Sequence, residues 1–188
     1  MKDGERKKAM KNILLGVTGS IACYKACDIA NDLTKKGHSV HVVMTEAGSK
    51  FVTPLTFMTL TKNKVGTDIF DESDPKSVEH IRLASEADLL VVCPATADFI
   101  AKAAHGIADD LLSAAYLAYV NKPIIVCPAM NTNMYENQAT QDHIRILKER
   151  GVTIVEPKVD HLACGTTGKG ALAGTDTILQ CIETFIND

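Results

Sequence analysis

Short apolar runs that alternate with helical segments limit this chain to few folds. Five runs predict buried strands, at 12–17 (NILLGV), 39–44 (SVHVVM), 88–93 (DLLVVC), 123–127 (PIIVC) and 152–155. Helical patterns separate or follow them at 20–36, 49–61, 78–86, 97–120, 133–150 and 176–186. Continuous apolar strands alternating with helices are typical of a parallel sheet covered on both faces. We therefore predict a single α/β domain of three layers, with a Rossmann-like or flavodoxin-like doubly wound sheet.

The length and net charge of the chain limit the classes of protein to which it can belong. A chain of 188 residues suits one domain, and its net charge of −3 argues against a nucleic-acid-binding protein. No apolar run approaches the length of a membrane span. The six cysteines form no CxxC pair, and we see no signal peptide, so we expect free thiols in the reducing cytoplasm.

Domain limits follow from the polar segments. Residues 1–11 predict a flexible N-terminal tail, with Met10 as an alternative start, and residues 12–188 predict the folded domain. The stretch 156–174 predicts a long loop, because it holds Gly165, Gly168, Gly170 and Gly174. Such a loop suits a mobile lid over a substrate.

A short sequence repeat points to one edge of the predicted sheet. LLVVCPA at 89–95 is matched by IIVCPA at 124–129. We expect Pro94 and Pro128 to end their strands and to place two turns side by side. Strand termination by itself would be enough to explain the two prolines. The small and polar residues that follow both of them favour a ligand site.

Two small-residue turns could hold a phosphate. Gly19 and Ser20 lie between the first strand and the first helix, where Gly19 allows close approach and Ser20 is a good N-cap. Thr45 opens a similar turn after the second strand. The GxGxxG pattern is absent, so a mononucleotide fits better than a dinucleotide. The alternative is helix caps without a ligand.

Three further residues could carry chemistry. His80 could move a proton, although a lone histidine is more often a surface or capping residue. Asn131, between Met130 and Met134, could donate a hydrogen bond to a carboxylate or could merely cap a helix. Cys164 could exchange a proton from the glycine-rich loop or be incidental.

These stretches in this order resemble the homo-oligomeric flavin-containing cysteine decarboxylases. The matching stretches are GVTGSIACYKA (16–26), His80 ahead of ADLLVVCPATAD, PAMNTNMYEN (128–137) and LACGTTGKGALA (162–173). The resemblance covers residues 12–186 and implies FMN as cofactor. It assigns Gly19, Ser20, Ile21 and Thr45 to the phosphate, and to the rest of the flavin it assigns Thr96, Ala97, Asp98, Phe99 and Ala129.

The resemblance also implies a mechanism. With bound FMN supplying reversible transfer of a hydride equivalent, the cysteine end of the substrate would lose carbon dioxide, and Cys164 would supply a proton to the product. His80 would be the base and Asn131 would hold the carboxylate, with Ala163 and Leu172 as further substrate contacts. Within the family Cys164 favours 4′-phosphopantothenoylcysteine, a precursor of coenzyme A, as substrate of this carboxy-lyase. Family members assemble as trimers or dodecamers.

Alternatives and departures stay open at this point. A peptidyl-cysteine decarboxylase is disfavoured by Cys164, and a flavin prenyltransferase by PAMN together with the cysteine loop. A non-catalytic flavin-binding subunit is disfavoured by the joint presence of His80, Asn131 and Cys164. Tyr135 stands where the family usually has tryptophan, which we expect to affect the pocket, and Cys23 replaces a usual alanine. No ligase half follows in this sequence, so the ligase is expected on a separate protein.

Overall fold

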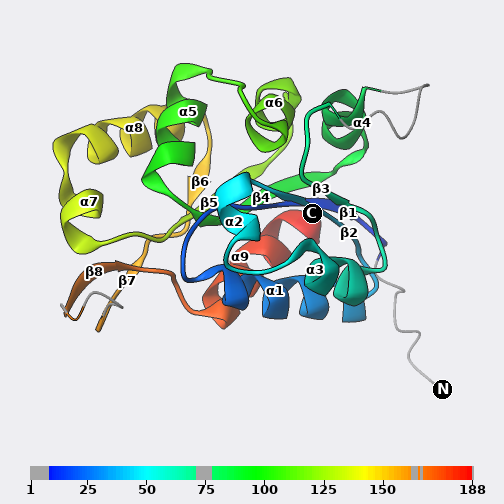
Figure 1. The fold of residues 1–188 in the computed structure, drawn as a ribbon, viewed down its shortest axis with the longest axis horizontal. Coiled ribbons are helices and arrows are strands. Elements are labelled where there is room, and N and C mark those ends of the chain that lie inside the picture. The colour runs from blue at the N-terminus through cyan, green and yellow to red at the C-terminus, as the bar shows by residue number, and fades with distance from the viewer. Residues whose placement is uncertain (1–8, 71–77, 162–164, 166, 188) are drawn as a thin grey trace.

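A six-stranded parallel sheet forms the centre of the molecule (Figure 1). The computed structural model describes residues 9–70, 78–161, 165 and 167–187. The strand order is β3-β2-β1-β4-β5-β6. The strands are β1 (Asn12–Val17), β2 (Ser39–Met44), β3 (Val65–Gly66), β4 (Leu89–Ala95), β5 (Ile124–Pro128) and β6 (Thr153–Ile154). This topology confirms the predicted doubly wound α/β fold.

Helices cover both faces of the sheet. On one face lie α1 (Cys23–Lys35), α3 (Pro54–Thr61) and α9 (Thr175–Ile186). On the other lie α4 (Glu79–Glu86), α5 (Ala97–His105), α6 (Leu111–Ala118) and α8 (Gln138–Glu149). Two short helices, α2 (Glu46–Ser49) and α7 (Thr132–Glu136), each follow a strand. Figure 1 therefore shows the three layers that the sequence predicted.

The strands supply both cores because their side chains alternate between the faces. In β4, Val91 and Cys93 pack on the α1 side, whereas Leu90 and Val92 pack on the α5 side. All four are fully buried. A strand buried on both faces has to be apolar at every position, which explains the continuous apolar runs.

The order of the strands reverses between β1 and β4, and Thr18 joins the two strands just beyond this point. Its Oγ1 donates to the Pro94 carbonyl at 2.7 Å and accepts from the Thr96 amide at 2.9 Å. Thr18 is 1% exposed. In open parallel sheets the ligand crevice opens where the order reverses, so Thr18 lies at the base of the expected site.

Several local expectations are corrected. Pro94 does not end its strand, because β4 continues to Ala95. The register with β5 shifts between Val92 and Ala95, so the pairing does not need the amide hydrogen that proline lacks. The two proline turns nevertheless lie side by side, since the Ala129 amide donates to the Ala95 carbonyl at 3.0 Å. The predicted helix over 49–61 begins only at Pro54, as α3, and the short helix α2 before it ends at Ser49.

The beginning of α1 also differs from the expectation. Ser20 is not its N-cap, because the Ser20 carbonyl first accepts from the Cys23 amide in a turn. The helix therefore starts at Cys23, after Ala22 as N-cap. It ends as predicted before Gly37, whose φ of +90° suits glycine.

The segment 156–174 is not a loop throughout. It forms an antiparallel hairpin of β7 (Lys158–His161) and β8 (Thr167–Ala171), separate from the main sheet. Glycines at 168 and 170 suggested a loop, but both lie within β8. Within the described part of the chain, no helix is long and apolar enough to span a membrane.

We predict that Thr18→Val destabilises the fold by about 1–3 kcal/mol, because the partly buried Thr96 amide loses its partner and the Pro94 carbonyl keeps only the Thr18 amide. Equilibrium unfolding in urea measures this change. The control is Thr59→Val, since the exposed Thr59 hydroxyl bonds only within α3, to the Leu55 carbonyl. Equal stability losses in the two variants would contradict the role given to Thr18.

Candidate functional site

One hollow of about 460 Å³ opens at the carboxyl ends of β1, β2 and β4, and we call it the threonine hollow. Its size lies in the range of small-molecule sites. Three of the sequence-predicted residues in it follow different strands, namely Gly19, Thr45 and Thr96. Its full lining is Thr18, Gly19, Thr45, Glu46, Ala47, Thr96, Ala97, Asp98, Lys102, Asp109, Asp110 and Met134.

Helix beginnings face the threonine hollow. Thr96 caps α5 by accepting from the Phe99 amide at 3.3 Å, and Thr45 caps α2 by accepting from the Gly48 amide at 3.1 Å. The first amides of a helix have no carbonyl partner within it, and its dipole is positive at this end. The hollow therefore offers donors to an anion, as the turns at Gly19 and Thr45 predicted.

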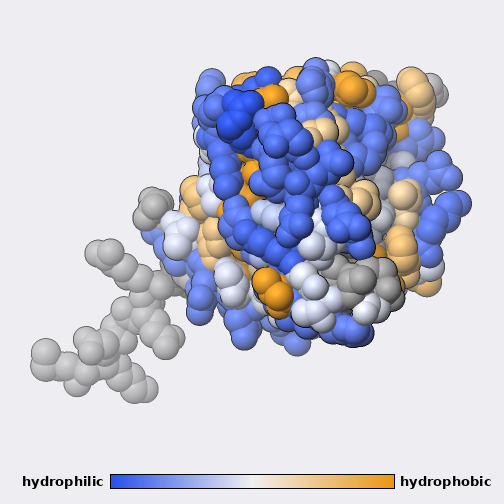
Figure 2. All heavy atoms as spheres, turned by 90° about the vertical axis from the view of Figure 1, so that its left-hand side faces the viewer, coloured by the Kyte–Doolittle hydropathy of each residue, from blue (hydrophilic) through white to orange (hydrophobic). Residues whose placement is uncertain are grey.

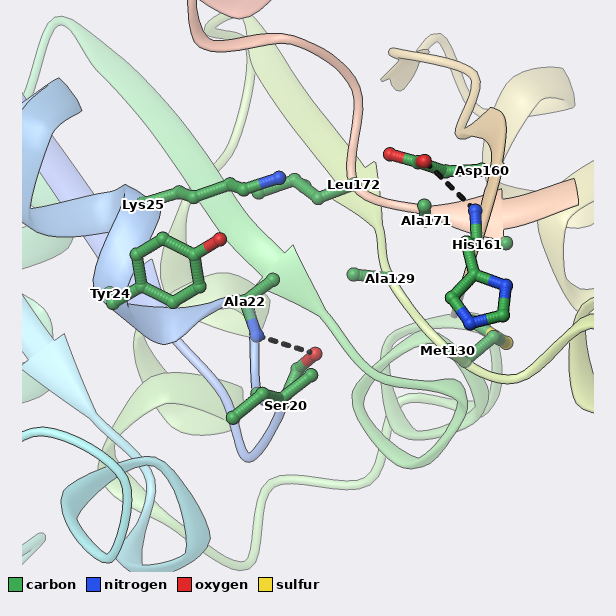
Figure 3. Close-up of a pocket in the computed structure, with 12 residues that line it drawn as sticks. Ser20, Ala22, Tyr24, Lys25, Ala129, Met130, Asp160, His161, Ala171 and Leu172 are labelled. Atoms are coloured by element: carbon green, nitrogen blue, oxygen red, sulfur yellow. Dashed lines mark hydrogen bonds between the residues drawn. The ribbon is translucent and has the colours of Figure 1, made fainter. Parts of the chain in front are cut away.

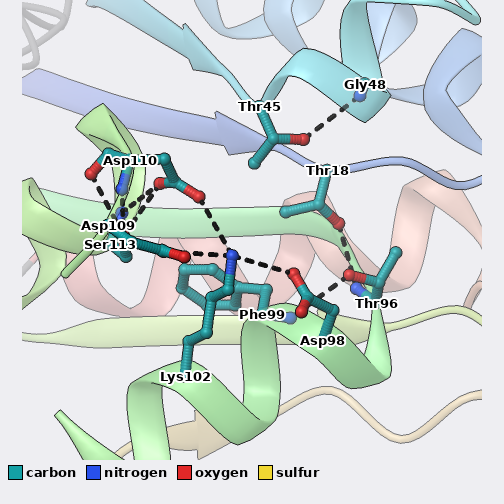
Figure 4. Close-up of polar contacts among 10 residues, drawn as sticks. All are labelled: Thr18, Thr45, Gly48, Thr96, Asp98, Phe99, Lys102, Asp109, Asp110 and Ser113. Carbon is teal, nitrogen blue, oxygen red and sulfur yellow. Dashed lines mark hydrogen bonds and ion pairs between the residues drawn. The ribbon is translucent and has the colours of Figure 1, made fainter. Parts of the chain in front are cut away.

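Lys102 binds three carboxylates on one wall of this hollow (Figure 4). Its Nζ lies 3.3 Å from Asp98, 3.0 Å from Asp109 and 3.6 Å from Asp110. Burial lowers the pKa of Lys102, but hydrogen bonds to Asp109 and Asp98 outweigh this and raise it. The same contact with Lys102 lowers the pKa of Asp109. This wall is net negative, so it suits hydroxyl or amide donors better than a phosphate.

A second hollow of about 350 Å³ lies beside the first, and we call it the hairpin hollow. The two hollows meet at consecutive residues, because Gly19 lines one and Ser20 the other. Figure 3 shows Tyr24 and Lys25 of α1 on one side and Asp160 and His161 of β7 on the other. The full lining is Ser20, Ile21, Ala22, Tyr24, Lys25, Ala129, Met130, Asp160, His161, Gly170, Ala171 and Leu172.

Asn131 stands beside the hairpin hollow as the N-cap of α7. Its Oδ1 accepts from the Asn133 amide at 2.8 Å, so it does cap a helix, as one sequence interpretation had it. Its neighbour Met130 lines the hairpin hollow, and Met134 lines the threonine hollow. Because the cap uses the side-chain oxygen, a carboxylate would be held by Nδ2, the atom that donates.

His80 lies away from both hollows. It lines a third one of about 340 Å³ between α4 and α6, together with Ile81 and Leu117. Its Nδ1 is buried and has no hydrogen bond to any described residue. Figure 1 places α4 and α7 at opposite ends of the molecule, so one chain does not bring His80 to Asn131.

The remaining predicted site residues divide into three groups. Ile21, Ala129 and Leu172 line the hairpin hollow, and Ala97 and Asp98 line the threonine hollow. Phe99 lines neither, because its ring is 2% exposed and packs edge-on against Tyr116. Ala163 and Cys164 lie outside the described residues.

Tyr135 lines neither hollow and binds Glu156. The Tyr135 hydroxyl donates to Glu156 Oε2 at 2.6 Å. Lys148 donates to Oε1 at 2.8 Å and Lys169 to Oε2 at 2.9 Å. Burial raises the pKa of Glu156, but these three hydrogen bonds outweigh it and lower the pKa to about 2. Tyr135 therefore does not shape the pocket directly, contrary to the sequence expectation.

Sequence reasoning missed several lining residues. Asp160 and His161 carry no motif of their own, and Lys25 lies in the matching stretch 16–26 without having been given a role. The three residues meet only through folding. Lys102 could have been found, because it lies four residues after Asp98 on a predicted helix. Among the described residues no group of three or more His, Cys, Asp or Glu side chains could hold a metal ion.

Comparison with known sequences gives a consistent match. The family model described as Flavoprotein matches residues 1–187. The chain is 48% identical over 174 residues to a protein named Probable phosphopantothenoylcysteine decarboxylase from Streptococcus mutans, covering 92% of this chain and 97% of that one. It is 44% identical to the coenzyme A biosynthesis bifunctional protein CoaBC of Bacillus subtilis, of which it spans 42%.

Solved structures agree with this match. A PPC decarboxylase mutant complexed with pantothenoylaminoethenethiol has a TM-score of 0.85 and 31% identity, over 96% of this chain and all of that one. The FMN-dependent cysteine decarboxylase SpaF has a TM-score of 0.82 and 32% identity, over 96% and 97% of the two chains.

We predict that Glu156 stabilises the fold above pH 4.5 and that this contribution is lost as the pH falls towards 2. The pKa of Glu156 is about 2 in the folded state against 4.5 ordinarily, so the unfolded chain takes up the proton first. The side chain is 44% exposed, and after screening by solvent we expect about 1 kcal/mol. Unfolding in urea at pH 7 and at the lowest pH where the protein stays folded measures it.

Comparison with Glu156→Gln isolates this contribution from other acidic groups. The wild type should be the more stable protein at pH 7, and the difference should shrink at low pH. Glu149→Gln, which removes an exposed partner of Arg145, is the control and should show little difference at either pH. A difference for Glu156→Gln that stays constant with pH would refute the assignment.

Proposed function

The chain belongs to the Flavoprotein family, and on that premise we propose that it decarboxylates 4′-phosphopantothenoylcysteine to 4′-phosphopantetheine with FMN, in coenzyme A biosynthesis. The observation that carries the proposal is the 48% identity to the Streptococcus mutans decarboxylase over nearly the whole of both chains. Two adjoining hollows at the carboxyl edge of the sheet supply separate places for a cofactor and a substrate.

The threonine hollow fits FMN by its donor set. The phosphate would lie where the two hollows adjoin, at Gly19 and Thr45 of the threonine hollow and at Ser20 and Ile21 of the hairpin hollow. The amides of Ser20 and Thr45 already donate to the carbonyls of Thr18 and Val17, so these two residues would offer their hydroxyl groups. Thr96, Ala97, Asp98 and Ala129 would face the rest of the cofactor, and Phe99 would support them from the core. The carboxylates around Lys102 would accept from uncharged donors such as ribityl hydroxyls. Bound FMN would supply reversible transfer of a hydride equivalent.

The hairpin hollow fits an extended substrate with charged ends. Leu172 gives an apolar wall, and Lys25 places a positive charge on the α1 side. Asn131 would hold the substrate carboxylate through Nδ2. Cys164 would donate a proton to the product from the segment between β7 and β8, and Ala163 would contact the substrate. The five described cysteines are free thiols, which suits the cytoplasm proposed for this enzyme.

His80 completes this set only if a second copy of the chain is present. As the base near the substrate thiol, His80 would have to reach a hollow that its own chain builds at the other end of the molecule. Exposed apolar side chains near His80, among them Ile81 and Leu117, suit burial against another subunit. We therefore propose a trimer, alone or within a dodecamer, in which neighbouring subunits share each site.

The direct test uses purified protein. The flavin released on denaturation should be FMN, and incubation with phosphopantothenoylcysteine should give phosphopantetheine, as measured by mass spectrometry. A peptide ending in cysteine serves as the competing substrate and should not react. Release of FAD, absence of flavin after reconstitution, or preference for the peptide would contradict the proposal.

The shared site predicts complementation between inactive variants. His80→Asn and Asn131→Asp should each be inactive alone, although aspartate keeps the α7 cap. Co-expressed and purified as mixed oligomers, they should recover roughly a quarter of wild-type turnover, because sites formed by one intact residue from each neighbour arise by chance. Mixed oligomers that stay inactive would show that His80 and Asn131 do not act across a subunit boundary.

A further inference from the structure

We infer that Glu156 and Tyr135 are positioning residues that hold the β7–β8 hairpin against α7 and so fix the outer wall of the hairpin hollow. The inference rests on the proposed function, because it concerns substrate binding in that hollow. Neither residue lines the hollow. The hairpin beside them contributes Asp160 and His161 to its lining, and Leu172, which directly follows β8, lines it too.

Glu156 is the point where three parts of the chain meet. It lies between β6 and β7, Tyr135 lies in α7, Lys148 in α8 and Lys169 in β8. Lys169 Nζ also lies 5.3 Å from the centroid of the Tyr135 ring. The Glu156 carboxylate lies just before β7, at the base of the hairpin, and binds Lys169 of β8. It thus joins both strands of the hairpin to α7 and α8, the two helices that follow β5.

Close backbone packing fixes the position of the hairpin on α7. The Met130 amide donates to the Gly170 carbonyl at 2.9 Å. A Cβ at Gly170 would collide with the Met130 carbonyl, and one at Gly168 would collide with Thr132. The backbone of β8 therefore lies directly on the segment that carries Asn131, and a small shift of the hairpin changes the width of the hollow.

The buried phenol is the decisive contact in this network. Lys148, Lys169 and Glu156 have side chains 51%, 42% and 44% exposed, so solvent weakens their ion pairs. Figure 2 shows that this side of the molecule is largely hydrophilic. Tyr135 is only 4% exposed, and a hydrogen bond from a buried donor to a carboxylate is stronger and costly to lose.

The experiment compares substrate binding, cofactor binding and hairpin dynamics in the FMN-loaded protein. Glu156→Ala and Tyr135→Phe should raise the KM for phosphopantothenoylcysteine by on the order of tenfold and threefold, with FMN affinity unchanged. Hydrogen exchange, followed by mass spectrometry, should speed up in 158–161 and 167–171 but not in the central strands. Tyr135→Trp keeps an aromatic N–H donor and should restore a KM close to wild type.

Glu149→Ala is the matched control, because it removes a carboxylate from α8 that pairs only with Arg145 among the described residues. The inference fails if Glu156→Ala keeps wild-type KM and hairpin exchange, or if exchange speeds up equally in hairpin and core. Should Glu156→Ala fold poorly, Tyr135→Phe and Tyr135→Trp decide alone. Wild-type protein without turnover would refute the proposed function, whereas the exchange data would still test the anchoring of the hairpin.

Discussion

The pairing of β1 with β4 is the constraint on which the site depends. These strands are far apart in sequence, yet they lie side by side at the point where the strand order reverses. Thr18 holds the segments beyond their ends together by bonding both Pro94 and Thr96. Because those segments then diverge towards opposite faces, a crevice opens above Thr18, and both hollows border it.

The charges around this crevice are divided in a way that suits a ligand with unlike ends. Helix beginnings at Thr45 and Thr96 present amides, whereas the wall around Lys102 presents carboxylates. Lys102 offsets the repulsion among Asp98, Asp109 and Asp110 and joins α5 to the beginning of α6. Asp110 also forms a capping box with Ser113, which fixes the start of α6. The wall is therefore held in shape without a ligand.

The substrate side is built differently, from an element outside the main sheet. The β7–β8 hairpin rests on α7 through glycine backbone and through Glu156, and α1 faces it across the hollow. A hairpin of two strands has little stability alone, so its place depends on these tertiary contacts. The Tyr135 hydroxyl adds a hydrogen bond to this anchoring, because it donates to the Glu156 carboxylate.

The sequence by itself determined the layers of this protein, because burial on both sheet faces forces continuous apolar strands and the helices between them show their own period. It also identified Gly19, Thr45 and Thr96 as turns at one edge, since parallel strands all end there. It misplaced the start of α1, because a turn at Ser20 precedes the helix, and the end of β4, because a register shift lets the strand continue past Pro94. The hairpin within 156–174 was missed because its glycines are required by close packing on α7, which no local pattern records.

Only the tertiary structure decided which predicted residues meet. Ile21 and Leu172 line the same hollow, and Asn131 follows the lining residue Met130. Phe99 is buried in the core, and His80 lines a separate hollow between α4 and α6. Tyr135 bonds Glu156, 21 residues further along the chain, and Lys25 lies across the hairpin hollow from Asp160. Their geometry follows from how whole elements pack, and hydrophobic periodicity carries no information about it.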